Sequence, residues 1–210
     1  MITLPFIGII VLLGYFFSKQ IRKNSTVLYV IFTIIAIVAT VFRKVPLFMP
    51  FYKAFFGLAI FYVVMMVGVL DKKKALYKRL YSIRAELSII GFIILTPHSI
   101  FYLIDKFIYS GTFELIGLIT YIIMVPLFIT SFKKIRSKFQ FYNWKKIQNF
   151  AYIAYLLLFV HLIISASLQI NLVVYIILFV PYIVYKPIHY FKHEKEFYAK
   201  VKKNYLKKEK

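Results

Sequence analysis

The chain has 210 residues, of which 62% are apolar and 20% aromatic, and its mean hydropathy of +0.79 is too high for a soluble domain of this size. Its formal net charge is +21, but Lys and Arg form short clusters between apolar runs, which favours anionic lipid headgroups over nucleic acid as the partner. Cysteine is absent, which excludes disulfides and thiolate metal sites and leaves histidine as the candidate metal ligand.

Seven apolar segments are candidate transmembrane helices. A helix needs roughly 20 apolar residues to cross the hydrocarbon core, and backbone amides in lipid must be paired within the helix, so strands are not expected. Met1 leads into apolar sequence with no basic region or small-residue cleavage site, so the first helix is expected to remain in the mature protein. The predicted spans, of which the first and last are short, are residues 2–17, 26–42, 51–70, 86–104, 113–131, 149–168 and 171–185.

The positive charges predict the orientation of these spans, because cytoplasmic loops retain Lys and Arg. The segments after the first, third and fifth spans, together with the C-terminal tail, hold 24 of the 28 basic residues. We therefore expect a multi-pass protein of the cytoplasmic membrane with seven spans, its N-terminus outside and its C-terminus inside. The alternative is an even number of spans, with one short end segment lying in the interface. Residues 186–210 are expected to form a basic amphipathic helix on the inner leaflet.

Two histidines inside the spans are the main functional candidates, because ionisable residues are costly to bury in a membrane. His98 follows Arg84 by 14 residues in the fourth span, and His161 follows Lys146 by 15 residues in the sixth. Both spans run outward, so the imidazoles are expected at nearly one depth, slightly to the outer side of the midplane. Such a pair fits the two axial ligands of one haem in an apolar sheath. Alternatively, each histidine hydrogen-bonds a neighbouring helix or lines a water cavity.

The order of several motifs resembles a known family. Residues 84–102, with a Gly-Phe pair followed by His98 and Tyr102, look like the first haem-ligand helix of the ferric-reductase-like transmembrane domain. Residues 113–152 are similar to the next stretch of that domain, which has a Leu-Gly run, a Thr-Ser pair, a Trp and a Leu-His-x-x-x-Tyr motif. Over about residues 80–190, the closer resemblance is to the haem-binding membrane subunit of the bacterial periplasmic methionine sulfoxide reductase system.

The resemblance implies an all-α membrane protein, a bundle of about seven transmembrane helices made of a six-helix ferric-reductase-like core and an added N-terminal helix. The expected divisions are N-terminal transmembrane helices in residues 1–50, the haem-binding core in residues 51–186 and a basic cytoplasmic tail in residues 187–210. The resemblance also implies one haem b, with His98 and His161 as its iron ligands.

Two further features concern the placement of this haem. Lys53 at the outer start of the third span, with Arg43 and Lys44 just before it, is a candidate partner for the haem propionates; ordinary snorkelling is the alternative. Where the family motif has Leu-His, this chain has Ile147-Gln148, and an amide is a poor haem ligand. We therefore expect the haem in the outer half of the bilayer and no histidine pair in the inner half.

The implied function is electron transfer across or within the cytoplasmic membrane, as a subunit of an oxidoreductase system rather than a self-contained enzyme. The segments between spans leave no room for a nucleotide-binding domain, so the expected donor is a quinol or a flavin such as FMN. The expected protein partners are a cytoplasmic flavin reductase and an extracytoplasmic acceptor reductase. The alternative function is a cofactor-free small transporter or accessory subunit, in which the histidines bind protons or a substrate.

Overall fold

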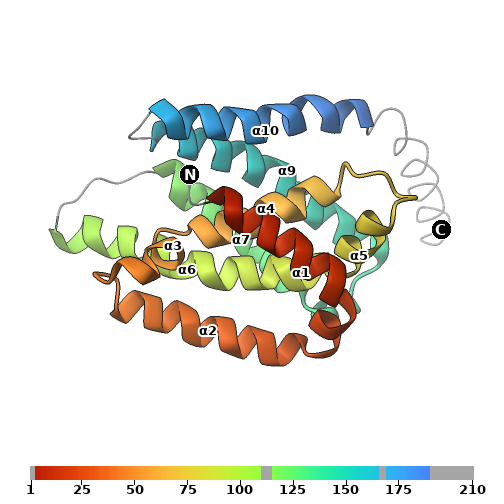
Figure 1. The fold of residues 1–210 in the computed structure, drawn as a ribbon, viewed down its shortest axis with the longest axis horizontal. Helices are drawn as coiled ribbons and strands as arrows, with labels where there is room; N and C mark the ends of the chain where they lie inside the picture. The colour runs from red at the N-terminus through yellow and green to blue at the C-terminus, as the bar shows by residue number, and fades with distance from the viewer. Residues whose placement is uncertain (1–2, 110–114, 166–168, 190–210) are drawn as a thin grey trace.

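The computed structural model describes residues 3–109, 115–165 and 169–189, and all regular structure in this part of the chain is helical (Figure 1). The prediction of an all-α membrane protein is therefore confirmed. The elements are α1 (Thr3–Lys23), α2 (Ser25–Val41), the 3-10 helix η1 (Pro46–Phe48), α3 (Met49–Tyr52), α4 (Phe55–Val67), α5 (Ala75–Ser82), α6 (Arg84–Tyr109), α7 (Leu115–Ser131), α8 (Lys133–Arg136), α9 (Phe141–Ile164) and α10 (Gln169–His189).

The seven predicted apolar segments all coincide with helices, but the helices differ in length. α1, α6 and α9 are each long and apolar enough to cross a bilayer alone, and the η1–α3 segment with α4 forms a fourth candidate span that is bent by 42°. The apolar helices of the other three segments, α2, α7 and residues 172–188 of α10, are at most 17 residues long, which is close to the lower limit of about 17 for a transmembrane helix.

Several boundaries differ from the prediction. α1 continues through its basic last turn to Lys23, and Asn24 alone separates it from α2, because long basic side chains can reach the headgroups from a helix that extends beyond the hydrocarbon. The third span is not continuous: the helix breaks at Lys53 and Ala54, where Ala54 has a left-handed φ of 60°. α9 begins at Phe141 rather than near residue 149.

The core is built around α4, in which nine of thirteen residues are buried. On one side α4 packs against α1, α5 and α6 in a cluster that includes Ile60 and Ile83. On another side it packs against α6, α7, α9 and α10 in a cluster that includes Phe61 and Phe179. α4 is therefore surrounded by protein, and it joins the N-terminal helices to the helices that carry the two histidines.

Two glycines let α4 and α6 cross closely. A Cβ atom added to Gly91 would lie 3.0 Å from Cγ2 of Ile60 and 3.2 Å from the ring of Phe61, and one added to Gly57 would lie 3.4 Å from the Gly91 carbonyl oxygen. Small residues allow this approach between membrane helices, where dispersion contacts drive association. The crossing holds α6, which carries His98, against the core.

The basic connecting segments gather at one end of the bundle. The turn between α1 and α2, helix α5 and the C-terminal end of α10 all lie on the right in Figure 1. Arg79 of α5 donates a hydrogen bond of 2.6 Å to the Tyr15 carbonyl and so ties α5 to α1. The amphipathic helix predicted for residues 186–210 lies outside the described residues from residue 190 onward.

Candidate functional site

The two intramembrane histidines lie side by side. His98 on α6 and His161 on α9 have ring centroids 6.4 Å apart, with the ring planes inclined by 71°. Counting residues from the basic ends of the two helices predicts that these imidazoles lie at one depth, and in the packed bundle the two rings are neighbours. The pair is therefore a candidate site to which two separate helices contribute. These helices begin 57 residues apart in the sequence, at Arg84 and Phe141.

The separation of the two rings fits a shared metal ion. Two imidazoles that bind one metal from opposite sides, each through a bond of about 2 Å, place their ring centres roughly 6 Å apart. Among the residues that the structure describes, no group of three or more His, Cys, Asp or Glu side chains comes together. A haem needs only two protein ligands, so it suits this donor set better than a metal held by side chains alone.

Gly117 of α7 determines where the imidazole of His161 can lie. A Cβ atom added to Gly117 would be 3.0 Å from Cε1 and 3.1 Å from Nδ1 of that ring. The Nδ1 atoms of both His98 and His161 are buried from solvent. A side chain at position 117 would therefore require the His161 imidazole to shift by a few tenths of an ångström.

A hydrogen bond and stacked rings attach the helix of His98 to α7. The Tyr121 hydroxyl donates to Oγ1 of Thr96 at 3.2 Å, and the Thr96 hydroxyl donates to the Phe92 carbonyl at 2.8 Å. The rings of Phe92 and Tyr121 are stacked with centroids 5.1 Å apart. On its other side, the imidazole of His98 lies 4.7 Å from the ring of Tyr102. These contacts tie α6 to α7 and place the ring of Tyr102 beside the candidate site.

The structure places Lys53 in the break between α3 and α4, where its side chain is exposed. The neighbouring Tyr52 packs edge-on against Phe101 of α6 with centroids 5.5 Å apart. The guanidinium of Arg43 lies 4.5 Å from the centroid of the same Phe101 ring. Lys53 and Arg43 therefore belong to a basic segment that packs on α6 within one helical turn of His98.

At the level of Gln148, hydrogen-bonded side chains join α9 to α7. The Gln148 amide donates to Oγ1 of Thr130 at 2.9 Å, and the Trp144 indole donates to the Thr130 carbonyl at 3.1 Å. At the start of α6, the Arg84 side chain lies close to the buried Tyr155 of α9. These polar contacts occupy the positions from which a second pair of ligands would have to project.

Sequence reasoning did not assign a role to Gly117, Thr96 or Tyr121. Gly117 appeared only as part of a Leu-Gly run, although a glycine inside a helical pattern often marks a close approach of another group. Thr96 and Tyr121 are ordinary residues for a membrane helix, and only the packed structure shows that they meet.

Comparison with known proteins gives one family. The model described as "Ferric reductase like transmembrane component" matches residues 54–159, about half of the chain. The matched range contains His98 and ends two residues before His161.

A protein of Treponema pallidum (strain Nichols), described as an uncharacterized protein, is 30% identical over 168 residues. The aligned region covers 69% of this chain and 46% of that protein, so the chain spans about half the length of this relative. No solved structure matches the chain.

Proposed function

The chain belongs to the ferric reductase like transmembrane family, and from this premise we propose that it is a b-type haem protein that transfers electrons in the membrane. The observation that carries the proposal is the 6.4 Å separation of the His98 and His161 rings. These two side chains would hold the iron, and the haem would supply reversible one-electron chemistry.

The residues around the pair suit electron transfer. A haem iron held by two protein imidazoles would favour electron transfer over binding of oxygen. Gly117 fixes the position of the His161 ring, and the Tyr121–Thr96 hydrogen bond fixes α6. The ring of Tyr102 lies beside the His98 imidazole, and the stacked rings of Phe92 and Tyr121 join α6 to α7 on the inner side of this pair.

We propose a single haem, placed toward the outer surface, in a chain whose N-terminus is outside and whose C-terminus is cytoplasmic. The hydrogen-bonded Gln148 supports the single site, and the basic segments gathered at one end of the bundle support the orientation. Electrons would come from a quinol or a flavin such as FMN, with a cytoplasmic flavin reductase as a partner. An extracytoplasmic reductase would accept them, as in the methionine sulfoxide reductase system that the sequence resembles.

An absorption spectrum of the purified full chain tests the proposal. Membranes from haem-replete cells should yield a red protein whose bands sharpen and split on reduction, as expected for low-spin haem b. His98→Ala and His161→Ala should each abolish these bands. His193→Ala, in the C-terminal tail, is the matched control and should leave them unchanged.

Two results would overturn the proposal. A colourless, folded wild-type protein from haem-replete cells would favour a transporter or an accessory subunit without a cofactor. Retention of the low-spin bands in both His98→Ala and His161→Ala would show that other residues hold the haem.

A further inference from the structure

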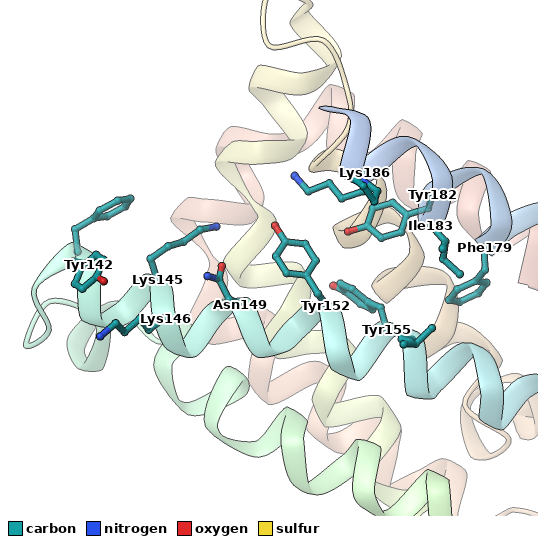
Figure 2. A pocket seen from close by; sticks show the side chains of 13 residues that line it. Tyr142, Lys145, Lys146, Asn149, Tyr152, Tyr155, Phe179, Tyr182, Ile183 and Lys186 are labelled. Carbon is teal, nitrogen blue, oxygen red and sulfur yellow. The ribbon is translucent and has the colours of Figure 1, made fainter. Parts of the chain in front are cut away.

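A second site is formed between the first half of α9 and the last half of α10, at the basic end of the bundle. A groove of about 590 Å³ runs between these helices, within the range of roughly 300–1,000 Å³ that is typical of ligand pockets. In Figure 2, Lys145, Asn149 and Tyr152 project from α9 toward the space beneath α10, and Lys186 and Tyr182 project into it from α10. This groove shares no lining residue with the histidine site.

The mouth of the groove is positively charged. Its described lining contains three lysines, Lys145, Lys146 and Lys186, and no acidic residue. Lys186 is only 8% exposed, and its Nζ atom donates to the Gly68 carbonyl at 3.2 Å and lies 5.7 Å from the centre of the Tyr152 ring. The positive charge of the groove therefore favours a ligand with an anionic group.

The opposite end of the groove is apolar. From Lys145 to Leu156 the α9 helix rises about 16 Å, and over this length the lining changes from lysine to aliphatic and aromatic carbon. Leu156 is 52% exposed and Ile183 is 38% exposed, so this end is open at the surface of the bundle that would face lipid. A suitable occupant has an anionic head and a long apolar body.

We propose that the α9–α10 groove binds an acidic phospholipid of the inner leaflet. Its phosphate would lie between Lys145 and Lys186, and an acyl chain would follow Leu156 and Ile183. Basic pockets between membrane helices are suited to anionic headgroups at this depth. A small soluble anion would contact only the lysines at the mouth of the groove and would leave its apolar end empty. A phospholipid would contact both ends, so it fits the groove better. The proposal is independent of haem binding.

Competitive lipid binding to the full chain in mild detergent tests this proposal. Native mass spectrometry should show that phosphatidylglycerol binds more tightly than phosphatidylcholine, by roughly tenfold or more if two lysines act on the headgroup. Lys145→Gln/Lys186→Gln should remove this preference. The control Lys133→Gln/Lys134→Gln removes the same charge from the α8 segment outside the groove and should retain the preference.

The other outcomes overturn the proposal. Equal loss of preference in both double variants would show a general charge effect and no groove site. Displacement of phosphatidylglycerol by inorganic phosphate, FMN or a short-chain quinol at equal concentration would assign the groove to a soluble anion or a redox ligand. Circular dichroism checks whether Lys145→Gln/Lys186→Gln folds. If it does not, Lys145→Gln alone, which leaves the buried Lys186 in place, should lower the preference for phosphatidylglycerol several-fold. An unchanged preference in that single variant would contradict the proposal.

Discussion

The imidazole of His161 lies directly against the backbone of Gly117, at a distance where an added methyl group would meet Cε1 at 3.0 Å. The same helix, α7, reaches α6 through the Tyr121–Thr96 hydrogen bond. Because α7 packs against both α6 and α9, it sets the distance between the two histidines. The residues of α7 therefore offer direct tests of the candidate site that leave both histidines in place.

The first prediction concerns Gly117→Ala. The added methyl group overpacks the site, which typically costs about 1–3 kcal/mol unless the neighbouring ring moves, so we expect several-fold lower haem content or shifted low-spin bands. The haem-to-protein ratio and the reduced spectrum measure this. Gly8→Ala is the control, because a Cβ atom at Gly8 in α1 meets nothing within 4 Å. Identical spectra for the wild type and Gly117→Ala would contradict the close contact.

The second prediction concerns the link between α6 and α7. Tyr121→Phe and Thr96→Val each remove the interhelical hydrogen bond, so the double variant should lose less stability than the sum of the single variants. The coupling should be about 0.6 kcal/mol and at most about 1.7 kcal/mol, as for other hydrogen bonds between membrane helices. Unfolding in mixed micelles measures it in a double-mutant cycle. Strictly additive losses would mean that the two side chains do not interact.

The third prediction is that replacing Gln148 lowers the stability of the protein without changing its haem content. Gln148→Leu removes its bond to Thr130 and should cost about 0.5–1.5 kcal/mol of unfolding free energy, while the haem content stays at one per chain. Gln140→Leu is the matched control, since Gln140 is exposed and makes no side-chain cap bond at the start of α9. Loss of haem bands in Gln148→Leu would show that a haem lies near this level.

The fourth prediction concerns Lys53 and Arg43. If they face the haem propionates, replacing either by Ala removes a positive charge that stabilises the reduced haem, which carries one positive charge fewer than the oxidised haem. The midpoint potential should then fall by an amount on the order of a few tens of millivolts, equivalent to about 1 kcal/mol or less. Redox titration measures this. Lys133→Ala, in the basic segment after α7, should leave the potential unchanged, and an equal fall there would indicate a general charge effect.

Much of this fold follows from the sequence, because seven apolar segments in lipid can satisfy their backbone only as helices. The 42° bend before α4 was not predicted. It depends on a left-handed Ala54, and alanine carries no local preference for that conformation. Likewise, residue counting placed His98 and His161 at one depth, but it contains no information on helix rotation. The contacts of Gly117 and Tyr121, which depend on that rotation, required the packed structure.

The different surroundings of α2 and α4 predict different patterns of change among homologous chains. Both helices have high apolar content, yet only Ala36 and Ala39 are buried in α2, whereas most of α4 is enclosed by protein. Positions on α2 that meet lipid should exchange freely among Leu, Ile, Val and Phe, because a fluid acyl chain adapts to any of their shapes. Positions on α4 should conserve side-chain volume as well as polarity, since protein neighbours cannot adapt in this way. Substitution rates along the chain would then distinguish the two helices where a hydropathy profile cannot.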